Sequence, residues 1–256
     1  MKKYIILLIL IFLNGCAGKN VLSDYRFQTQ TVPPYTIASW FKIEAPKEVL
    51  RIYIEGDGNA FNVKGQPTDN PTPKDTFVRT LAANDTNPNV AYLGRPCQYL
   101  QTGVCSQKDW TGGRFSKEIV ESMERAVLNL MKKASAKKVV LIGFSGGAQI
   151  AGLIAVENSD KIQEVITIAG VLDHQAWTDY HGDEALTDSL NLMDKKKQFD
   201  KIPQRHFVGE KDKVVPPELI QEFVLNENTI ILVPKATHNK GFEKIAKDLY
   251  KTEERE

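Results

Sequence analysis

The stretch "VVLIGFSGGAQIAG", Val139–Gly152, changes its hydrophobic pattern around a single serine. Its first residues form a short apolar run typical of a buried strand, and the residues from Gly146 onward have the spacing of an apolar helix. Gly143, Gly146 and Gly147 surround Ser145 at the junction. Small neighbours are needed where a strand and a helix approach closely and the serine backbone is strained. The stretch therefore predicts a strand, a sharp turn that exposes Ser145, and a helix; a glycine-rich packing turn is the alternative.

Short apolar runs alternate with helical patterns along the rest of the chain. Strands are predicted at 50–56, 89–94, 137–144, 164–170, 203–209 and 228–234, and helices at 76–83, 116–131, 146–157, 216–225 and 240–251. Two further segments, 25–31 and 35–43, lie on either side of Pro33-Pro34 and predict antiparallel edge strands. This alternation indicates an α/β fold, in which helices flank both faces of a mostly parallel central sheet.

The composition is that of a globular protein, the net charge indicates no nucleic-acid partner, and the motifs indicate no metal or cofactor. The 256 residues are 42% hydrophobic and 25% charged, with a formal net charge of +1. No linker divides residues 16–256, which indicates a single domain. The segment between the predicted strand 164–170 and Gln204 has only roughly 35 residues, too few for a large cap domain over the site. The segment GDGNAF lacks the third glycine of a dinucleotide fingerprint, and no H-E-x-x-H, Walker or EF-hand pattern occurs.

Two further polar residues follow predicted strands, at the edge where a parallel sheet gathers its functional groups. Asp212 comes shortly after the strand 203–209, and His238 lies in the loop after the strand 228–234. Taken alone, Asp212 is also typical of a turn and His238 of a solvated surface. Asp173, which follows the strand 164–170, is the alternative acid.

Ser145, Asp212 and His238 occur in the chain order Ser…Asp…His, and this order resembles that of the α/β-hydrolase family. The segments YIEGDGNAF, YLGRPCQY, GFSGGAQ, GEKDKVVPP and ATHNKGF carry the resemblance from Leu50 to the C-terminus. It implies that Ser145 is a nucleophile, His238 its general base and later the acid, and Asp212 the group that orients the imidazole.

The other three histidines fit the base role less well. His174 precedes Asp212 and would break the chain order, His181 lies in a polar segment, and His206 lies inside a predicted strand.

The resemblance also implies an oxyanion hole made of backbone donors. One donor is the N–H of Gly146, the residue after the nucleophile. The second comes from the segment EGDG, where we favour the N–H of Asp57 and keep Gly58 as the alternative. Glu55 stands where the family pattern has histidine, which leaves the identity of the second donor open.

Arg95, Trp110 and Arg114 lie in or beside the irregular segment that contains Cys97 and Cys105, near the mouth of the expected site. They are candidates to bind an anionic or aromatic part of a substrate. Packing and capping of the loop is the alternative role.

The N-terminal residues 1–15 are expected to be a signal peptide, since Lys2 and Lys3 precede the apolar run Tyr4–Leu13. Leu13-Asn14-Gly15-Cys16 resembles a bacterial lipobox, although Asn14 departs from it. The resemblance implies cleavage before Cys16, acylation of that cysteine, and permanent membrane anchoring. By analogy with lipoprotein sorting, Ala17 indicates the outer membrane, with the protein facing the periplasm.

With Cys16 acylated, Cys97 and Cys105 remain as an even pair in an oxidising compartment. They are expected to form a disulfide, because their spacing matches no zinc or redox motif.

Together these features predict an envelope-anchored serine hydrolase that cleaves a small-molecule carboxylic ester through an acyl-enzyme. A thioesterase or peptidase of the same fold is an alternative, and so is a non-catalytic binding or scaffold lipoprotein. The sequence gives no indication of the oligomeric state.

Overall fold

The computed structural model describes residues 21–46 and 48–251, and the predicted signal peptide and Cys16 lie outside this range. Its centre is an eight-stranded sheet in the order β1-β2-β4-β3-β5-β6-β7-β8. The strands are β1 (Arg26–Val32), β2 (Tyr35–Ile43), β3 (Leu50–Ile54), β4 (Asn89–Leu93), β5 (Val139–Phe144), β6 (Ile162–Ile168), β7 (Gln204–Gly209) and β8 (Ile230–Val233). β2 pairs antiparallel with β1 and with β4, and all other pairs are parallel. The predicted α/β fold is therefore confirmed.

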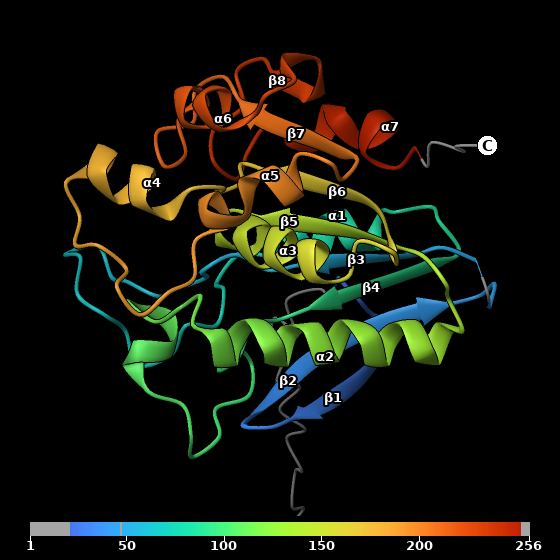
Figure 1. Ribbon diagram of the computed structural model, residues 1–256. Coiled ribbons are helices and arrows are strands. Elements are labelled where there is room, and N and C mark those ends of the chain that lie inside the picture. The colour runs from blue at the N-terminus through green and yellow to red at the C-terminus, as the bar shows by residue number, and fades with distance from the viewer. Residues whose placement is uncertain (1–20, 47, 252–256) are drawn as a thin grey trace, which may run out of the picture.

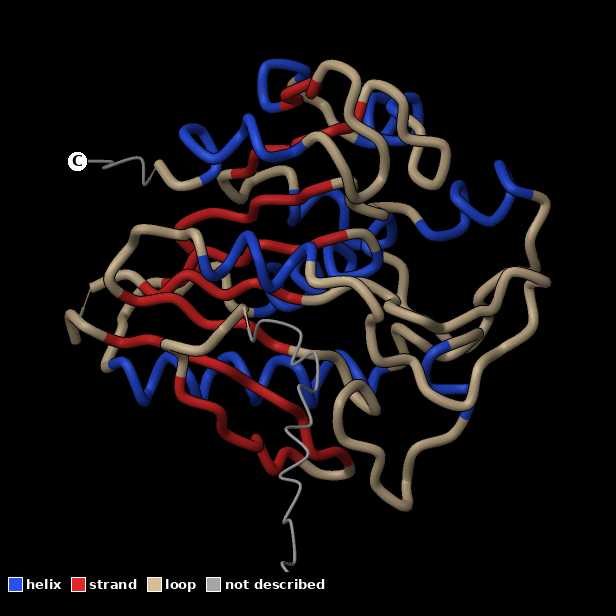
Figure 2. Tube along the Cα trace, turned by 180° about the vertical axis from the view of Figure 1, so that it is seen from behind, coloured by secondary structure: helices blue, strands red, loops and turns tan. Residues whose placement is uncertain are grey.

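Helices cover both faces of this sheet, and Figure 1 shows α2 and α3 in front of it and α1 behind, while Figure 2 gives the opposite view. The α-helices are α1 (Phe77–Ala83), α2 (Lys117–Ala134), α3 (Gly146–Glu157), α4 (His174–His181), α5 (Lys196–Phe199), α6 (Pro217–Phe223) and α7 (Ala246–Leu249). Short 3-10 turns are η1 (Gln107–Trp110), η2 (Leu192–Lys195), η3 (Glu227–Thr229) and η4 (Phe242–Ile245).

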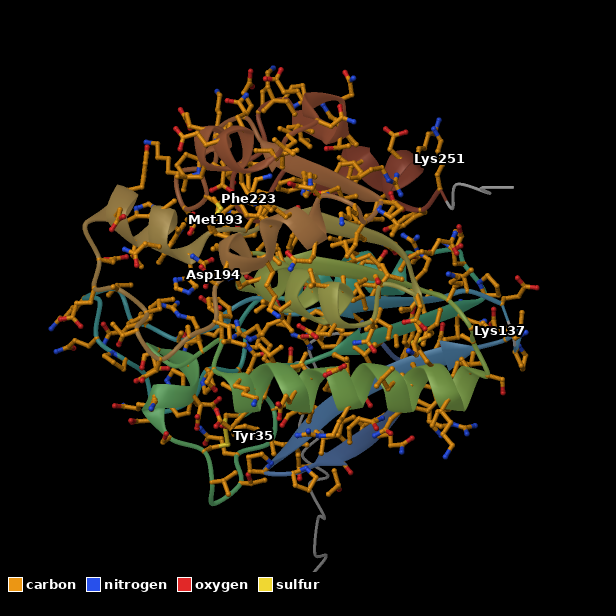
Figure 3. The ribbon with its side chains drawn as sticks, in the orientation of Figure 1. Tyr35, Lys137, Met193, Asp194, Phe223 and Lys251 are labelled. Carbon is orange, nitrogen blue, oxygen red and sulfur yellow. A yellow bond between two sulfur atoms is a disulfide. The ribbon has the colours of Figure 1, made fainter. Side chains whose placement is uncertain are left out.

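Alternate side chains of β5 enter two separate hydrophobic cores. Val139 and Leu141 pack in the core under α2 and α3, whereas Val140 and Ile142 pack in the core under α1, η4 and α7. Burial on both sides explains why this strand is an unbroken apolar run in the sequence. In the core under α2 and α3, Phe223 of α6 (labelled in Figure 3) packs against Phe199 of α5. The centroids of the two rings are 6.0 Å apart.

The strand order places a crevice at the carboxyl ends of β3 and β5. These two strands are neighbours, but the chain leaves β3 toward β4 on one side and leaves β5 toward β6 on the other. Loops that diverge in this way leave a crevice, and in α/β sheets ligands bind at such switch points.

One predicted element differs in the structure, and the expected absence of a large cap agrees with it. The expected closing helix 240–251 is instead η4 followed by the four-residue α7, because Gly241 takes a φ of 89° and starts a tight turn. The connection between β6 and β7 contains α4, η2 and α5 and forms no large cap. Within the described ranges, no helix is long and apolar enough to cross a membrane.

Cys97 and Cys105 form a disulfide whose Cα atoms are 5.7 Å apart. It closes the loop that precedes η1. The hydroxyl of Tyr35, labelled in Figure 3, donates to Asp109 of η1 at 2.8 Å and joins this region to β2.

We predict that Asp85→Ala strongly destabilises the fold. Asp85 accepts hydrogen bonds from Arg51 Nε and from the Tyr53 hydroxyl, both at 2.7 Å, and the side chains of this ion pair are 1% and 0% exposed. The variant leaves the buried guanidinium of Arg51 without its counter-ion, which costs about 3–5 kcal/mol. For a domain of this size, that lowers the thermal midpoint by roughly 10 °C.

The control is Asp160→Ala, since Asp160 pairs with Lys161 on the surface. Its free energy of unfolding should change by less than about 0.5 kcal/mol. Equal midpoints for the two variants would contradict the structural role of Asp85.

Candidate active site

Ser145 lies on a sharp corner between β5 and α3, as its sequence pattern predicts. Its backbone has a φ of 50° and a ψ of −123°, a conformation that non-glycine residues rarely adopt. The corner needs glycine on both sides. A Cβ on Gly143 would lie 2.5 Å from the Cα of Ala148, and one on Gly147 would lie 2.5 Å from the carbonyl oxygen of Ile54.

A chain of hydrogen bonds joins Ser145 to His238 and Asp212. His238 Nε2 lies 3.0 Å from Ser145 Oγ, and His238 Nδ1 lies 2.9 Å from Asp212 Oδ2. The other carboxylate oxygen of Asp212 accepts from the N–H groups of Val214 and Val215, at 2.8 and 3.0 Å. The Asp212 carboxylate is thus fixed by the loop before α6 and in turn orients the imidazole. This arrangement can transfer a proton from the serine hydroxyl to the imidazole.

The alternative acid and two of the other histidines have different environments. Asp173 is the N-cap of α4 and accepts from the N–H groups of Gln175 and Ala176. His206 is buried in β7, where Thr167 and Gln204 are hydrogen-bonded to its two ring nitrogens. His181 lies at the end of α4, with Nε2 2.9 Å from the carbonyl oxygen of Val214.

Ser145 and His238 open into a cavity of about 440 Å³ at the crevice between β3 and β5. Four aromatic side chains contribute to its walls: Phe61, Phe115, Phe144 and Trp177. The ring of Phe144 also lies 5.0 Å from that of His238. A largely apolar cavity with a few polar groups is typical of a small-molecule site.

Asp57 lines this cavity, and Gly146, the residue after Ser145, lies next to Asp57. A Cβ on Gly146 would overlap the Asp57 carboxylate, so this carboxylate lies directly against the Gly146 backbone. The N–H groups of both residues donate no hydrogen bond within the described part of the chain. They are therefore free to donate to a substrate oxygen. Gly58, the alternative donor, also lines the cavity.

The Asp57 carboxylate is held between two arginines. It forms ion pairs with Arg95 Nη1 and, at 2.6 Å, with Arg114 Nη1. Burial alone would raise the pKa of the Asp57 carboxyl, but Arg114 and Arg95 outweigh burial and hold the pKa below its usual value. Asp57 is thus ionised, and the two guanidinium groups more than balance its charge.

Of the three residues considered for substrate binding, only Arg114 lines the cavity. Arg95 lies behind Asp57 and also donates to the carbonyl oxygen of Arg114. Trp110 points elsewhere and donates through Nε1 to the carbonyl oxygen of Thr68 at 3.0 Å. For Arg95 and Trp110 the structure therefore supports the alternative role of packing and capping the loop.

Sequence reasoning missed two cavity residues. Glu55 is buried, with its carboxylate accepting from Tyr92 at 2.6 Å and from the N–H of Gly56 at 3.0 Å. His174 was considered only as a base, yet it is buried in the cavity wall. The sequence signal that could have indicated this position is that His174 directly follows Asp173, just after the end of the strand 164–170. Nowhere in the described ranges does a group of three or more His, Cys, Asp or Glu side chains gather as metal ligands would.

The parallel sheet and the serine corner define the chain as an α/β-hydrolase. Residues 80–235, more than half of the chain, match the family described as Serine hydrolase (FSH1). The chain therefore belongs to this serine hydrolase family. It has no significant match among curated proteins.

Similar solved structures include other α/β serine hydrolases and esterases. The chain is similar to an alpha-beta serine hydrolase homologue from Coxiella burnetii, with 18% identity, a TM-score of 0.55, and coverage of 88% of this chain and 93% of that one. The Pyrococcus furiosus esterase Pf2001 has 14% identity and a TM-score of 0.63, and the match covers 91% of each chain. Est1E from Butyrivibrio proteoclasticus, with bound ferulic acid, has 13% identity and a TM-score of 0.64, and the match covers 87% of this chain and 96% of that one. At these identities the likeness shows the shared fold.

We predict that Glu55→Gln changes how stability depends on pH. Burial raises the pKa of Glu55 from 4.5 to about 7, although hydrogen bonds from Tyr92 and Gly56 oppose the shift. Below pH 4.5 the carboxyl is protonated in both states; between pH 4.5 and 7 it ionises first in the unfolded chain. Ionisation of Glu55 therefore lowers the free energy of unfolding of wild type over this window by about 3 kcal/mol, and the variant lacks this contribution.

Urea unfolding at a series of pH values measures the effect. The difference in free energy of unfolding should grow in favour of Glu55→Gln as the pH rises through this window. Glu48→Gln, the same change at an exposed position, is the control and should run parallel to wild type. A parallel profile for Glu55→Gln would show that the carboxyl is not buried as described.

Proposed function

We propose that this serine hydrolase cleaves a carboxylic ester through a covalent acyl-enzyme, with Ser145, His238 and Asp212 as its triad. The observation that carries the proposal is the hydrogen-bonded chain from Asp212 through His238 to Ser145, which ends in a cavity of about 440 Å³. A volume of this size suits a small ester, and no large cap stands between β6 and β7.

In the first half-reaction, Ser145 Oγ attacks the ester carbonyl while His238 Nε2 takes the hydroxyl proton. The carbonyl oxygen becomes an oxyanion and accepts hydrogen bonds from the N–H groups of Gly146 and Asp57. As the C–O bond to the alcohol breaks, the protonated His238 gives its proton to the leaving oxygen. Asp212 stabilises the imidazolium throughout.

In the second half-reaction, water replaces the alcohol. His238 removes a proton from the water, whose oxygen attacks the acyl carbon, and the same two N–H groups bind the new oxyanion. Collapse of this intermediate breaks the bond to Ser145 Oγ, and His238 returns the proton to the serine. The products are one carboxylic acid and one alcohol.

An ester is the substrate that best fits the fold and the comparisons. Two of the similar structures, from Pyrococcus furiosus and Butyrivibrio proteoclasticus, belong to proteins named as esterases. Hydrolases that act on peptides usually carry an additional domain that selects them, and residues 16–256 are expected to form only one domain.

We further propose that acylated Cys16 anchors the enzyme to the outer membrane, facing the periplasm. The lipobox-like segment supports this location. The disulfide between Cys97 and Cys105 also supports it, because structural disulfides are typical of the oxidising envelope and rare in the bacterial cytosol.

The proposed nucleophile is tested by labelling the purified full-length protein with a fluorophosphonate and measuring its intact mass. We expect one adduct on wild type and none on Ser145→Ala. The same variant should hydrolyse short-chain para-nitrophenyl esters at least about 10³-fold more slowly, because the hydroxyl that forms the acyl-enzyme is gone.

The control variant is Ser23→Ala, an exposed serine outside the cavity, which should label and react like wild type. If folded wild-type protein takes up no label, Ser145 is not activated, and the binding-module function becomes the better account.

The proposed anchor is tested by detergent phase partitioning of the full-length chain produced in bacteria. Wild type should enter the detergent phase and incorporate labelled palmitate, whereas Cys16→Ser should do neither, because the acylated sulfur is missing. Cys105→Ser is the control for loss of a cysteine and should still incorporate palmitate. Palmitate on Cys16→Ser would refute anchoring through this residue.

A further inference from the structure

Gln98 is buried against the loop that carries the proposed second oxyanion donor. Its side chain is 2% exposed, and both ends of its amide are hydrogen-bonded. Nε2 donates to the carbonyl oxygen of Gly56 at 2.9 Å, and Oε1 accepts from the N–H of Arg95, also at 2.9 Å. A Cβ on Gly58 would lie 2.9 Å from the same Nε2, so the amide packs directly on this loop. Gln98 thus links the loop after β3 to the turn after β4.

The hydrogen bond to Gly56 sets the direction of the Asp57 N–H. The Gly56 carbonyl and the Asp57 N–H belong to one trans peptide group, so they point in opposite directions. The carbonyl points at Gln98, which is not among the described residues that line the cavity. Asp57 does line the cavity, and a Cβ on Gly56 would lie 3.2 Å from the Cβ of Ser145. The peptide group therefore lies beside the serine, with its N–H on the side opposite to Gln98.

The loop sequence alone does not fix this peptide group. Gly56 and Gly58 flank Asp57, and glycine allows rotation about its backbone bonds at little steric cost. The two ion pairs of Asp57 hold its carboxylate and not its peptide group. Within the described part of the chain, Gln98 makes the one hydrogen bond to this peptide group. Its orientation therefore depends on Gln98.

The turn that carries Gln98 is itself held on both sides. Cys97 and Tyr99 have φ values of 70° and 63°, a left-handed conformation that non-glycine residues rarely adopt. The disulfide holds Cys97, and the N–H of Tyr99 donates to Thr72 Oγ1 at 2.7 Å. Such conformations persist where the surrounding structure imposes them, and they gather at functional sites. The turn therefore keeps the Gln98 amide in a fixed position.

We propose that Gln98 is a positioning residue whose amide directs the Asp57 N–H toward the oxyanion. It does not touch the substrate and acts through the Gly56–Asp57 peptide group. Without the bond to Gly56, this peptide group rotates among several orientations, and the oxyanion loses one donor in part of the molecules. The inference rests on the proposed function, because it concerns the oxyanion that forms when Ser145 attacks an ester.

Gln98→Met tests this role, because methionine has a similar volume and makes neither hydrogen bond. Loss of one oxyanion donor lowers kcat by about 10²–10³-fold, so a donor that is misdirected part of the time should lower it at least about tenfold. We expect this fall in kcat for para-nitrophenyl acetate, per Ser145 site that takes up fluorophosphonate in the full-length protein. KM should change by less than about twofold, because the same N–H serves both half-reactions and the cavity that binds the ester is unaltered.

The matched control is Gln204→Met, since Gln204 donates through Nε2 to the carbonyl oxygens of Phe199 and Ile202 and is not among the described residues of the cavity wall. Its kcat and KM should equal those of wild type. An unchanged kcat in Gln98→Met, a loss carried by KM alone, or an equal loss in Gln204→Met would overturn the inference. Where Gln98→Met does not fold, Gln98→Asn is measured with the same expectations, because its shorter side chain cannot reach both partners.

NMR relaxation of the backbone amides separates this inference from the proposed function, since it requires no ester cleavage. The order parameter of the Asp57 amide should be about 0.85 in wild type and in Gln204→Met, as in rigid backbone, and below about 0.6 in Gln98→Met. Equal order parameters in wild type and Gln98→Met overturn the inference, whatever the activity. If wild type cleaves no ester, the proposed function fails, and the relaxation data still decide whether Gln98 holds this peptide group.

Discussion

The close approach of three backbone segments at the end of β5 positions the rest of the site. Gly143 and Gly147 have no side chains, so the first turn of α3 packs directly against β5 and the end of β3. The chain must therefore reverse at Ser145, which takes a positive φ. Hydrogen bonds from the Ser145 N–H to the carbonyl oxygen of Ile168, and from the N–H of Val171 to the Ser145 carbonyl oxygen, hold this strained residue in place. Its hydroxyl then projects into the cavity rather than into either core.

The ion pairs of Asp57 connect this corner to loops that lie far away in the sequence. Arg95 follows β4 and Arg114 precedes α2, and both reach the loop after β3 through one carboxylate. A lone carboxylate beside Gly146 would oppose the negative charge that develops on a substrate oxygen. With two guanidinium groups on it, this ion-pair cluster is positive and would favour the oxyanion of the proposed mechanism. The loops that carry Arg95 and Arg114 would then contribute electrostatically to a site whose reacting groups they do not supply.

The sequence predicted those features that depend on local pattern. The strand, corner and helix around Ser145 were predicted from a change of hydrophobic period and from the glycines beside the serine. Asp212 and His238 were predicted as site residues because each follows the end of a predicted strand. The features it missed depend on contacts between distant segments. Nothing near Arg95 shows that its partner is Asp57, and nothing near His174 shows that Phe115 covers its ring. Burial and pairing of single polar side chains are properties of the tertiary structure and leave no periodic signal.

Glu55 is a buried carboxylate of the cavity wall that has no ion-pair partner among the described residues. Away from the cavity, Asp85 binds Arg51, and Glu164 binds Arg205 through both carboxylate oxygens. On the cavity wall, Asp57 is paired with two arginines, whereas Glu55 accepts only from the Tyr92 hydroxyl and the N–H of Gly56. Stability alone would favour an apolar side chain at this position, since an uncompensated buried charge raises the free energy of the folded state. The free-energy cost at Glu55 is therefore a local feature of the cavity wall.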